Sequence, residues 1–322
     1  MSEKPRISIV IVTYKSMPFI DRCLAPIAGK AEFEIIVWEN ASSDGLADHV
    51  STAYPDVLVF DSPENLGFAR GNNAAFDHCT GDYVLLLNPD AFLETSKQVH
   101  ALAGWLDAHP DHAACGPQLV HADGSHQVGD AGWRISLKSV TAHSFMLQRA
   151  LPALPSLYLT NSRLRRRQSV DVDWVCGACM MVRRDVIQSV GGLDADVFMY
   201  GEDIEWGTRM RQAGWKVAYL PQIMVTHLQG ASQKDSGALF ASTKWMDDVA
   251  MRYCQSGKKS GYLALRAALA SGFALRGVLF AAGSLVRRKS SLFDKSRIAF
   301  AFARHALSLP SYRNWRKDRA HL

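Results

Sequence analysis

Tyr83-Val84-Leu85-Leu86-Leu87-Asn88-Pro89-Asp90 is a short apolar run that ends in Asn-Pro-Asp. Bounded by Gly81 and Pro89, such a run is typical of a strand buried on both faces of a parallel sheet. Pro89 cannot donate to a sheet ladder, so the chain is expected to leave the sheet there. Asp90 would then follow the carboxyl end of a central strand, where open α/β sheets bind ligands. On this segment alone an ordinary turn and a ligand site are equally compatible with Asn-Pro-Asp.

Strands and helices are predicted to alternate on both sides of this run. Apolar, β-branched segments predict strands at residues 6–13, 34–38, 56–60, 113–120, 172–183 and 215–220. Helices are predicted from an N-cap at Ser16 through Ala28, then to about Ala53, and over 65–78, 95–109 and 202–213. Residues 121–169 are poorly periodic and predict a long loop region with one helix near 137–151. The alternation predicts an α/β fold with a doubly wound, mostly parallel sheet.

The basic residues are concentrated at the C-terminal end of the 322-residue chain. From Gln255 onward there are fourteen Lys and Arg against two Asp, whereas the first 254 residues carry a net charge of −7. We therefore expect an α/β domain over residues 1–235 and a helical, basic region over 236–322. Such a region is attracted to phosphate, either in lipid headgroups or in nucleic acid.

Residues 261–286 are long and apolar enough to span a bilayer. Arg266 and Arg276 argue against spanning, because a central Arg costs about 2.5–3.5 kcal/mol on insertion scales. Lys259, Arg266, Arg276 and Arg287 fall on one side of a helix, which predicts a basic stripe lying in the plane of an anionic bilayer. Arg287-Arg288-Lys289 would add attraction to headgroups. The alternative is a helix packed on the first domain with its arginines directed to water.

The cysteines and the N-terminus indicate a cytoplasmic protein. The six cysteines are scattered, which suggests a reducing compartment, and no signal-peptide core is visible. Cys176-Gly177-Ala178-Cys179 has the spacing of a redox or zinc pair, but it lacks a second pair and lies between apolar residues. We interpret it as part of a buried strand. The first βα turn, Thr13-Tyr14-Lys15-Ser16, contains no glycine, which argues against dinucleotide binding.

Five motifs in order resemble a known family. They are Ile9-Val-Ile-Val-Thr-Tyr14, Glu39-Asn-Ala-Ser-Ser-Asp-Gly45, Asn65-Leu-Gly-Phe-Ala-Arg-Gly-Asn-Asn73, Leu86-Leu-Asn-Pro-Asp90 and Gly201-Glu-Asp203. Over residues 5–230 the chain resembles a family 2 glycosyltransferase of the GT-A fold, close to the bacterial rhamnosyltransferase-like branch. The resemblance implies inverting transfer from a nucleotide diphosphate sugar, with Mg²⁺ or Mn²⁺, to a saccharide or lipid-linked saccharide in cell-surface polysaccharide synthesis.

The same resemblance implies a donor and a location. Deoxythymidine diphosphate rhamnose is the first donor expected from this branch. Such enzymes often act on lipid-linked acceptors, which with the basic C-terminal region predicts peripheral attachment to the inner face of the plasma membrane. We expect an anionic membrane surface, and no nucleic acid, as the partner of that region.

The metal site is implied by the same resemblance. Asp90 takes the metal-binding place of the family's Asp-x-Asp motif, with Asn88 in place of the first carboxylate, and His227 is a further metal or diphosphate contact. Oxygen ligands suit Mg²⁺ or Mn²⁺. With one strong carboxylate, the metal would be held largely by the diphosphate, so weak binding without donor is expected. A lone His is more often structural, but the position of His227 after the last predicted strand makes a structural role and a binding role equally compatible.

Glu202 and Asp203 are candidates for the catalytic base. Acids at a helix N-terminus complement the helix dipole, so a structural role is possible. An inverting transfer, however, needs a base that takes the proton of the acceptor hydroxyl. By resemblance, Asp203 is the expected base and Glu202 its support, whereas Glu205 is expected to be structural.

The donor is expected to contact residues that follow the predicted strands. By resemblance these are Thr13, Tyr14, Glu39, Asn40, Asp44, Asn65, Gly67, Arg70, Asn72 and Asn88. Glycines and helix N-terminal amides at 65–73 suit a diphosphate, although a tight capped loop is the alternative. The family usually has Asp at the position of Glu39, where it contacts the pyrimidine. The additional methylene of Glu39 means that this contact must be rearranged.

Other functions fit less well. A sugar-1-phosphate nucleotidyltransferase should have a glycine-rich, Arg-containing loop after the first strand, and residues 13–16 lack one. A processive polysaccharide synthase should have several transmembrane helices and a Gln-x-x-Arg-Trp motif. A non-catalytic carbohydrate- or lipid-binding module remains the alternative of a different class, against which the presence of both Asp90 and Asp203 counts.

Overall fold

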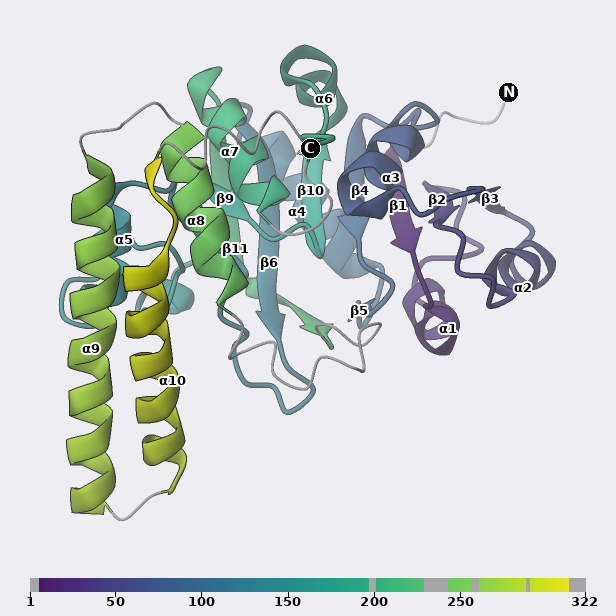
Figure 1. Ribbon diagram of the computed structural model, residues 1–322. Coiled ribbons are helices and arrows are strands. Elements are labelled where there is room, and N and C mark those ends of the chain that lie inside the picture. The colour runs from purple at the N-terminus through teal and green to yellow at the C-terminus, as the bar shows by residue number, and fades with distance from the viewer. Residues whose placement is uncertain (1–5, 197–200, 229–242, 256–260, 288–289, 313–322) are drawn as a thin grey trace. The chain divides into compact units, whose positions relative to one another are not determined.

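The computed structural model describes residues 6–196, 201–228, 243–255, 261–287 and 290–312 (Figure 1). The chain divides into two compact units, one formed by residues 1–132 and 162–235 and the other by 133–161 and 236–322. The division into residues 1–235 and 236–322 that was expected from the sequence stays a prediction. Residues 133–161, however, group with the C-terminal helices and not with the sheet.

The first unit is built on one mixed, mostly parallel sheet with strand order β3-β2-β1-β4-β10-β6-β11-β5. Four neighbouring strands are parallel: β3 (Val57–Asp61), β2 (Phe33–Glu39), β1 (Ile7–Thr13) and β4 (Tyr83–Leu87). On the other side of β4, β10 (Cys179–Arg183) runs antiparallel to β4 and β6 (His112–Val120), and β11 (Lys216–His227) runs parallel to β6. Two short strands, β5 (Ala91–Phe92) and β8 (Val170–Val172), pair antiparallel with β11.

The strand predicted over 172–183 is interrupted. The chain forms β8, then β9 (Trp174–Val175), which pairs with β7 (Ala131–Gly132) in a separate small sheet, and finally β10. Gly177 lies in a turn between β9 and β10, where a Cβ would come within 3.0 Å of the Phe68 ring. The prediction of one buried strand was therefore wrong for Cys176, which is half-buried in this turn, and right for Cys179.

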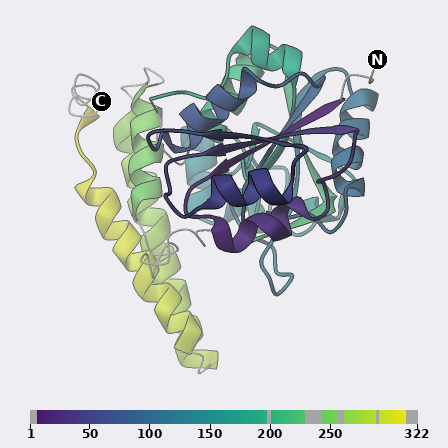
Figure 2. The same cartoon turned by 90° about the vertical axis from the view of Figure 1, so that its right-hand side faces the viewer.

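Helices cover both faces of the sheet. α1 (Met17–Leu24), α2 (Leu46–Ala53) and α4 (Lys97–Ala108) contribute to the main core cluster on one face. α3 (Gly67–Phe76) and α6 (Arg184–Val190) lie on the opposite face from α1 and α2 (Figure 2). α7 (Glu202–Gln212) packs against β9 and β11. α1 ends at Leu24, before the predicted Ala28, and the Ser16 hydroxyl bonds to Tyr14 instead of capping the helix.

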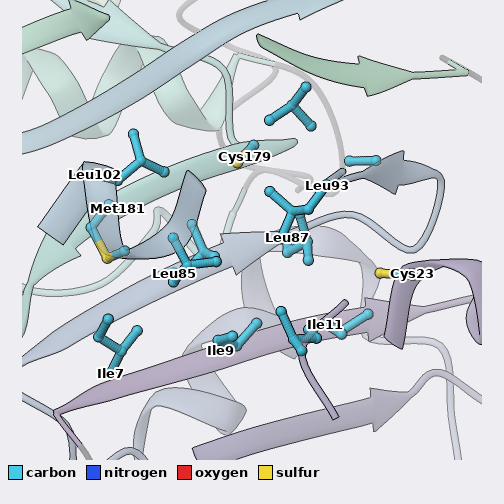
Figure 3. Close-up of a cluster of buried hydrophobic side chains, with 14 of the residues drawn as sticks. Ile7, Ile9, Ile11, Cys23, Leu85, Leu87, Leu93, Leu102, Cys179 and Met181 are labelled. Atoms are coloured by element: carbon cyan, nitrogen blue, oxygen red, sulfur yellow. The ribbon is translucent and has the colours of Figure 1, made fainter. Parts of the chain in front are cut away.

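The core explains why the apolar run around Leu85 indicated the fold. Alternate residues of β1, Ile7, Ile9 and Ile11, pack with Leu85 and Leu87 of β4 (Figure 3). All five residues of β4 are buried, as expected for a strand covered on both faces. The carboxyl ends of β1, β2, β3 and β4 therefore share one edge of the sheet, because these strands are parallel.

The second unit is helical and has an aromatic core. It contains α5 (Leu137–Ser144), the short helix η1 (Leu147–Arg149), α8 (Lys244–Gln255), α9 (Tyr262–Arg287) and α10 (Ser290–Ser308). The Phe273 and Phe302 rings meet edge to face, with centroids 5.4 Å apart, and Trp245 packs against both. The ring of His143 joins this cluster, and desolvation among these rings, with a smaller effect of Arg276, lowers the pKa of His143 to about 3. The imidazole is therefore neutral.

The predicted basic stripe on α9 was wrong for the two arginines whose side chains are described. The Arg276 guanidinium donates to the carbonyls of Ser144, at 2.8 Å, and His143, and so caps the end of α5. The Arg266 guanidinium donates to the carbonyls of Ala306, at 3.4 Å, and Leu307 in α10. Both guanidinium groups are thus bonded to backbone carbonyls of neighbouring helices, and Arg266 is half-buried. Lys259, Arg288 and Lys289 lie outside the described residues, as does the side chain of Arg287.

Substitution of Gly81, which lies just before β4, tests how closely the backbones of β1 and β4 pack. A Cβ there would lie 2.6 Å from the backbone nitrogen of Ser8 and 2.9 Å from the carbonyl carbon of Ile7, and a backbone cannot easily move aside. We expect Gly81→Ala to lower the free energy of unfolding by about 1–3 kcal/mol in chemical denaturation. Gly104, in α4, has nothing within 4 Å of its Cβ position, so Gly104→Ala should stabilise by up to about 1 kcal/mol. Equal effects of the two substitutions would contradict this packing.

Candidate active site

The end of β4 and the end of β11 are joined by the two-residue strand β5. Ala91 pairs with His227 and Phe92 with Thr226, and the backbone nitrogen of Leu228 donates to the carbonyl of Asp90 at 3.0 Å. This ladder brings Asp90 beside His227, with 3.3 Å between the carboxylate Oδ1 and the imidazole Nε2. Both residues are buried, with exposed fractions of 5% and 7%.

Asn88 completes this cluster. Its amide nitrogen lies 3.5 Å from His227 Nε2, the long limit of a hydrogen bond, and its backbone nitrogen donates to the carbonyl of Ala178 at 2.9 Å. Three residues that the sequence predicted for metal and donor binding thus converge. In the part of the chain that the structure describes, no three His, Cys, Asp or Glu side chains gather at one point. A divalent cation between Asp90 and His227 would therefore take its remaining ligands from a bound molecule or water.

Gln127 is a residue of this cluster that sequence reasoning missed. Its Oε1 accepts a hydrogen bond from Nδ1 of His227 at 2.9 Å, and only 2% of Gln127 is exposed. It lies in the poorly periodic stretch after β6, where no sequence pattern distinguishes one polar residue from its neighbours. The imidazole of His227 is therefore bonded to Gln127 at Nδ1, and its Nε2 faces Asp90 and Asn88.

At the edge of β1 and β2, Glu39 is held by protein donors. The Thr13 hydroxyl donates to its Oε2, and the backbone nitrogen of Ser42 donates to its Oε1 at 2.7 Å. Glu39 is 3% exposed, so its longer side chain spans from β1 to the turn that follows β2. The carboxylate expected to approach the nucleobase is therefore engaged by Thr13 and Ser42 in this structure.

The segment that follows β3 is tied to the end of β2. The amide nitrogen of Asn40 donates to the carbonyl of Gly67 at 3.2 Å, and its Oδ1 accepts from the nitrogen of Leu66 at 3.3 Å. Asn65 Oδ1 accepts from the nitrogen of Gly67 at 2.9 Å. Gly67 has φ +75°, a conformation that favours glycine. These contacts gather Asn40, Asn65 and Gly67 at the same edge as Thr13 and Glu39.

The other predicted donor residues have diverse environments. Asp44 accepts from the nitrogens of Met17 and Leu46 at 3.4 and 3.2 Å, Arg70 donates to the carbonyl of Ala195 at 3.0 Å, and buried Asn72 donates to the carbonyl of Phe68 at 2.9 Å. Tyr14 is 39% exposed at the end of β1. Asp44 and Arg70 thus join neighbouring protein segments, Asn72 bonds within α3, and Tyr14 faces outward.

Glu202 and Asp203 form the first turn of α7, after Gly201 with φ +84°. Asp203 Oδ1 accepts from the nitrogen of Ile204 at 2.7 Å, and Glu202 is 7% exposed. Met199 and Tyr200, which precede Gly201, lie outside the described residues. Glu205 pairs with Arg209 at 2.7 Å, which agrees with a structural role.

The turn at 176–178 connects these acids with the Asp90 cluster. Burial raises the pKa of the Cys176 thiol well above its usual value, and the carboxylates of Asp203, Asp130 and Glu202 raise it further. Two residues on, the carbonyl of Ala178 accepts from the nitrogen of Asn88. The turn is therefore bonded to the segment of Asn88 on one side and to Asp130 on the other.

Comparison with known proteins identifies two family models. The model described as glycosyl transferase family 2 matches residues 8–191, which include β1 to β10 and the Asp90 segment. The model described as glycosyl transferase family 21 matches residues 153–246.

Individual relatives agree with this match. The chain is 30% identical over 234 residues to the N-acetylglucosaminyl-diphospho-decaprenol L-rhamnosyltransferase of Mycobacterium tuberculosis, covering 68% of this chain and 75% of that protein. It is 26% identical over 255 residues to rhamnosyltransferase WbbL of Escherichia coli K12, covering 76% and 91%. Mannosyltransferase PcManGT from Pyrobaculum calidifontis, solved with GDP-Man and Mn²⁺, has the same fold, with a TM-score of 0.59, 18% identity and coverage of 95% of this chain and 88% of that one.

Proposed function

Because the chain belongs to glycosyl transferase family 2, we propose that it transfers a sugar from a nucleoside diphosphate donor to a lipid-linked saccharide, with inversion at the anomeric carbon. The observation that carries this proposal is the convergence of Asp90, His227 and Asn88 at the carboxyl edge of β4. Rhamnose is the first candidate sugar, because rhamnosyltransferases are among the relatives. The printed name of the mycobacterial relative specifies a diphospho-decaprenol acceptor, which favours a lipid-linked acceptor here.

In the proposed reaction Asp203 is the base. The acceptor oxygen forms a bond to the anomeric carbon while the bond from that carbon to the diphosphate oxygen breaks, and the electron pair leaves with the diphosphate. The acceptor proton passes to the carboxylate of Asp203. Glu202, its buried neighbour, supports the acceptor or the base. The turn at 176–178 bonds through the carbonyl of Ala178 to Asn88, at the edge where the diphosphate would leave.

Asp90 and His227 are the residues that would hold a divalent cation, and Asn88 would orient the donor beside them. Their fit to Mg²⁺ or Mn²⁺ rests on a buried carboxylate and an imidazole nitrogen 3.3 Å apart at a strand end. Bound there, the cation would supply positive charge that stabilises the departing diphosphate. Mn²⁺ in the solved mannosyltransferase supports the choice of cation.

The second unit is proposed to contact the bilayer through α9 and α10. Six large apolar residues of α9 are exposed and lie on one half of the helix: Leu263, Leu275, Val278, Leu279, Leu285 and Val286. The two charged residues between Tyr262 and Val286, Arg266 and Arg276, are bonded to protein carbonyls. By length and composition this segment could also cross a bilayer, with mean hydropathy 1.6.

α10 adds a face suited to a membrane interface. Phe293, Phe300 and Leu307 recur every seven residues and are exposed by 55%, 45% and 66%, and Arg297 and Arg304 are exposed near them. Apolar side chains next to arginines favour the boundary between acyl chains and anionic headgroups. We therefore infer a peripheral enzyme on the cytoplasmic membrane surface, with apolar insertion as the main attraction. Six free cysteines in the described structure agree with a reducing compartment.

Donor turnover tests the proposed activity. The purified chain should release nucleoside diphosphate from one member of a panel of nucleotide sugars, with thymidine diphosphate rhamnose as the first candidate. Excess chelator should abolish release, and added Mg²⁺ or Mn²⁺ should restore it. Full activity in chelator would refute the cation, and no turnover of any donor with a lipid-linked saccharide present would favour a binding module.

Asp203→Asn tests the base. The change is nearly isosteric but removes proton acceptance, so turnover should fall roughly a hundredfold or more while donor binding is largely retained. Asp185→Asn is a matched control, because Asp185 also lies in the first turn of a helix and accepts from the next backbone nitrogen at 2.8 Å. Normal turnover by the Asp203 variant would assign the base to Glu202 instead.

Flotation with phosphatidylglycerol-containing vesicles tests the membrane surface. Truncation near Gln255 is unsuitable because α9 and α10 share a core with residues 133–161, so the full chain is used. Leu275→Gln with Leu279→Gln should reduce the bound fraction about tenfold or more, given about 1.5–3 kcal/mol for burying each leucine. Binding of the wild type should largely persist at high salt. The control is Leu58→Gln with Met224→Gln, which changes exposed apolar residues of the sheet unit. An equal loss of vesicle binding in both double variants would contradict membrane contact through α9.

A further inference from the structure

Gln127 contacts the imidazole of His227 on the side away from Asp90. The Gln127 Oε1 can only accept, so the hydrogen bond of 2.9 Å requires a proton on Nδ1 of His227. In a neutral imidazole the other nitrogen, Nε2, then carries the lone pair. That nitrogen faces Asp90 Oδ1 at 3.3 Å and the amide nitrogen of Asn88 at 3.5 Å. The Nε2 lone pair and the Asp90 Oδ1 are both acceptors, so at 3.3 Å they repel each other. A positive charge between them would make this arrangement favourable.

The backbone around Gln127 is firmly anchored. The nitrogen of Gln127 donates to the carbonyl of Leu119 in β6 at 3.0 Å, and the preceding residue, His126, forms a bridge with Val120. Gln127 therefore lies beside the end of β6, next to the part of β11 that ends in His227, because β6 and β11 are neighbouring strands. Its position is set by the sheet and not by a free loop.

Asp130 fixes the other end of this short segment. Its carboxylate Oδ2 accepts from the Tyr219 hydroxyl at 2.7 Å, from His126 Nε2 at 3.0 Å and from the nitrogen of Leu119 at 3.3 Å. Asp130 is 1% exposed, and its carbonyl accepts from the nitrogen of Cys176 at 2.8 Å. Residues 126–130 are thus joined to β6, to β11 and to the turn that carries Cys176.

We infer that Gln127 is a positioning residue for the glycosyl transfer, which holds His227 in the Nδ1-protonated tautomer so that Nε2 can bind the divalent cation together with Asp90. This inference rests on the proposed function, because it assigns a role toward the cation of that site. A partner that orients a ligating imidazole typically changes metal affinity 10–100-fold when it is removed. Gln127 acts through His227 and does not itself contact the reacting atoms.

Two substitutions separate positioning from packing. Gln127→Leu keeps the approximate volume of a buried side chain but removes the acceptor. Gln127→Glu keeps an acceptor at the same reach but buries a charge. If Gln127 only fills space, the Leu variant should keep more of the cation affinity than the Glu variant. If Gln127 positions His227, the Glu variant should keep more of the cation affinity than the Leu variant. Gln148→Leu is the matched control, because Gln148 is also buried, at 1% exposure, and belongs to the helical unit.

The first readout is the tautomer of His227 in the metal-free full chain. Nitrogen-15 correlation spectra of histidine-labelled protein, with the signals assigned by His227→Asn, report which ring nitrogen carries the proton. The wild type and Gln127→Glu should show Nδ1 protonated, and Gln127→Leu should show the Nε2-protonated tautomer. An Nε2-protonated imidazole in the wild type, or no change in the Leu variant, would overturn the inference while leaving the proposed transfer intact.

The second readout is Mn²⁺ affinity, measured by electron paramagnetic resonance of free Mn²⁺ with thymidine diphosphate present. Gln127→Leu should weaken binding roughly 10–100-fold, and Gln127→Glu and Gln148→Leu should remain close to wild type. Equal affinity in wild type and Gln127→Leu would overturn the role of Gln127 alone. No Mn²⁺ binding by the wild type would overturn both this inference and the cation of the proposed function. Thermal denaturation of each variant shows whether a loss of affinity comes from unfolding.

Discussion

The candidate site depends on a ladder of two residue pairs. β5 consists only of Ala91 and Phe92, yet its antiparallel pairing with Thr226 and His227 fixes the end of the central strand against the end of β11. Without it, Asp90 would lie on a free turn and His227 at the end of an unrelated strand, more than a hundred residues away in sequence. The ladder joins the segment after β4 to the end of β11, and so fixes the buried carboxylate of Asp90 beside the buried imidazole of His227. A site that must stabilise a departing diphosphate benefits from this rigidity, because preorganised charge needs no rearrangement during the reaction.

Burial and partners divide the polar residues at this edge into two groups. Glu39, Asn40 and Asn65 have side chains that bind neighbouring loops, so they shape the edge of β1 to β3. Asp90 and His227 are held close to each other without a strong hydrogen bond between them. We interpret the first group as the frame of the donor site and the second as its reactive part. The engagement of Glu39 by Thr13 and Ser42 also suggests why Glu is accepted where the family usually has Asp: the longer side chain reaches both donors.

Much of the fold could be predicted from sequence, because β-branched and apolar runs such as those of β1 and β4 report burial directly. Asp90 was placed at a strand end by the same logic. The pairing of β5 with β11 was not predictable, since two residues carry no periodic signal and the partner is remote. The role of Gln127 was missed for the same reason.

Arg266 and Arg276 show a different limit: a helical projection gives the side on which charges lie, but not whether protein or solvent covers that side. Their capping of α5 and α10 leaves an apolar face outward instead.

Anomalous diffraction at the manganese edge tests the central claim most directly. Crystals of the full chain would be grown with Mn²⁺ and thymidine diphosphate, and the position of the ion would be located from its anomalous signal. We expect one ion bound directly by Nε2 of His227 and by the Asp90 carboxylate, the latter at about 2.1 Å as for small divalent ions with oxygen ligands, with diphosphate oxygens completing its coordination. An ion that contacts the diphosphate but neither of these side chains would contradict the account.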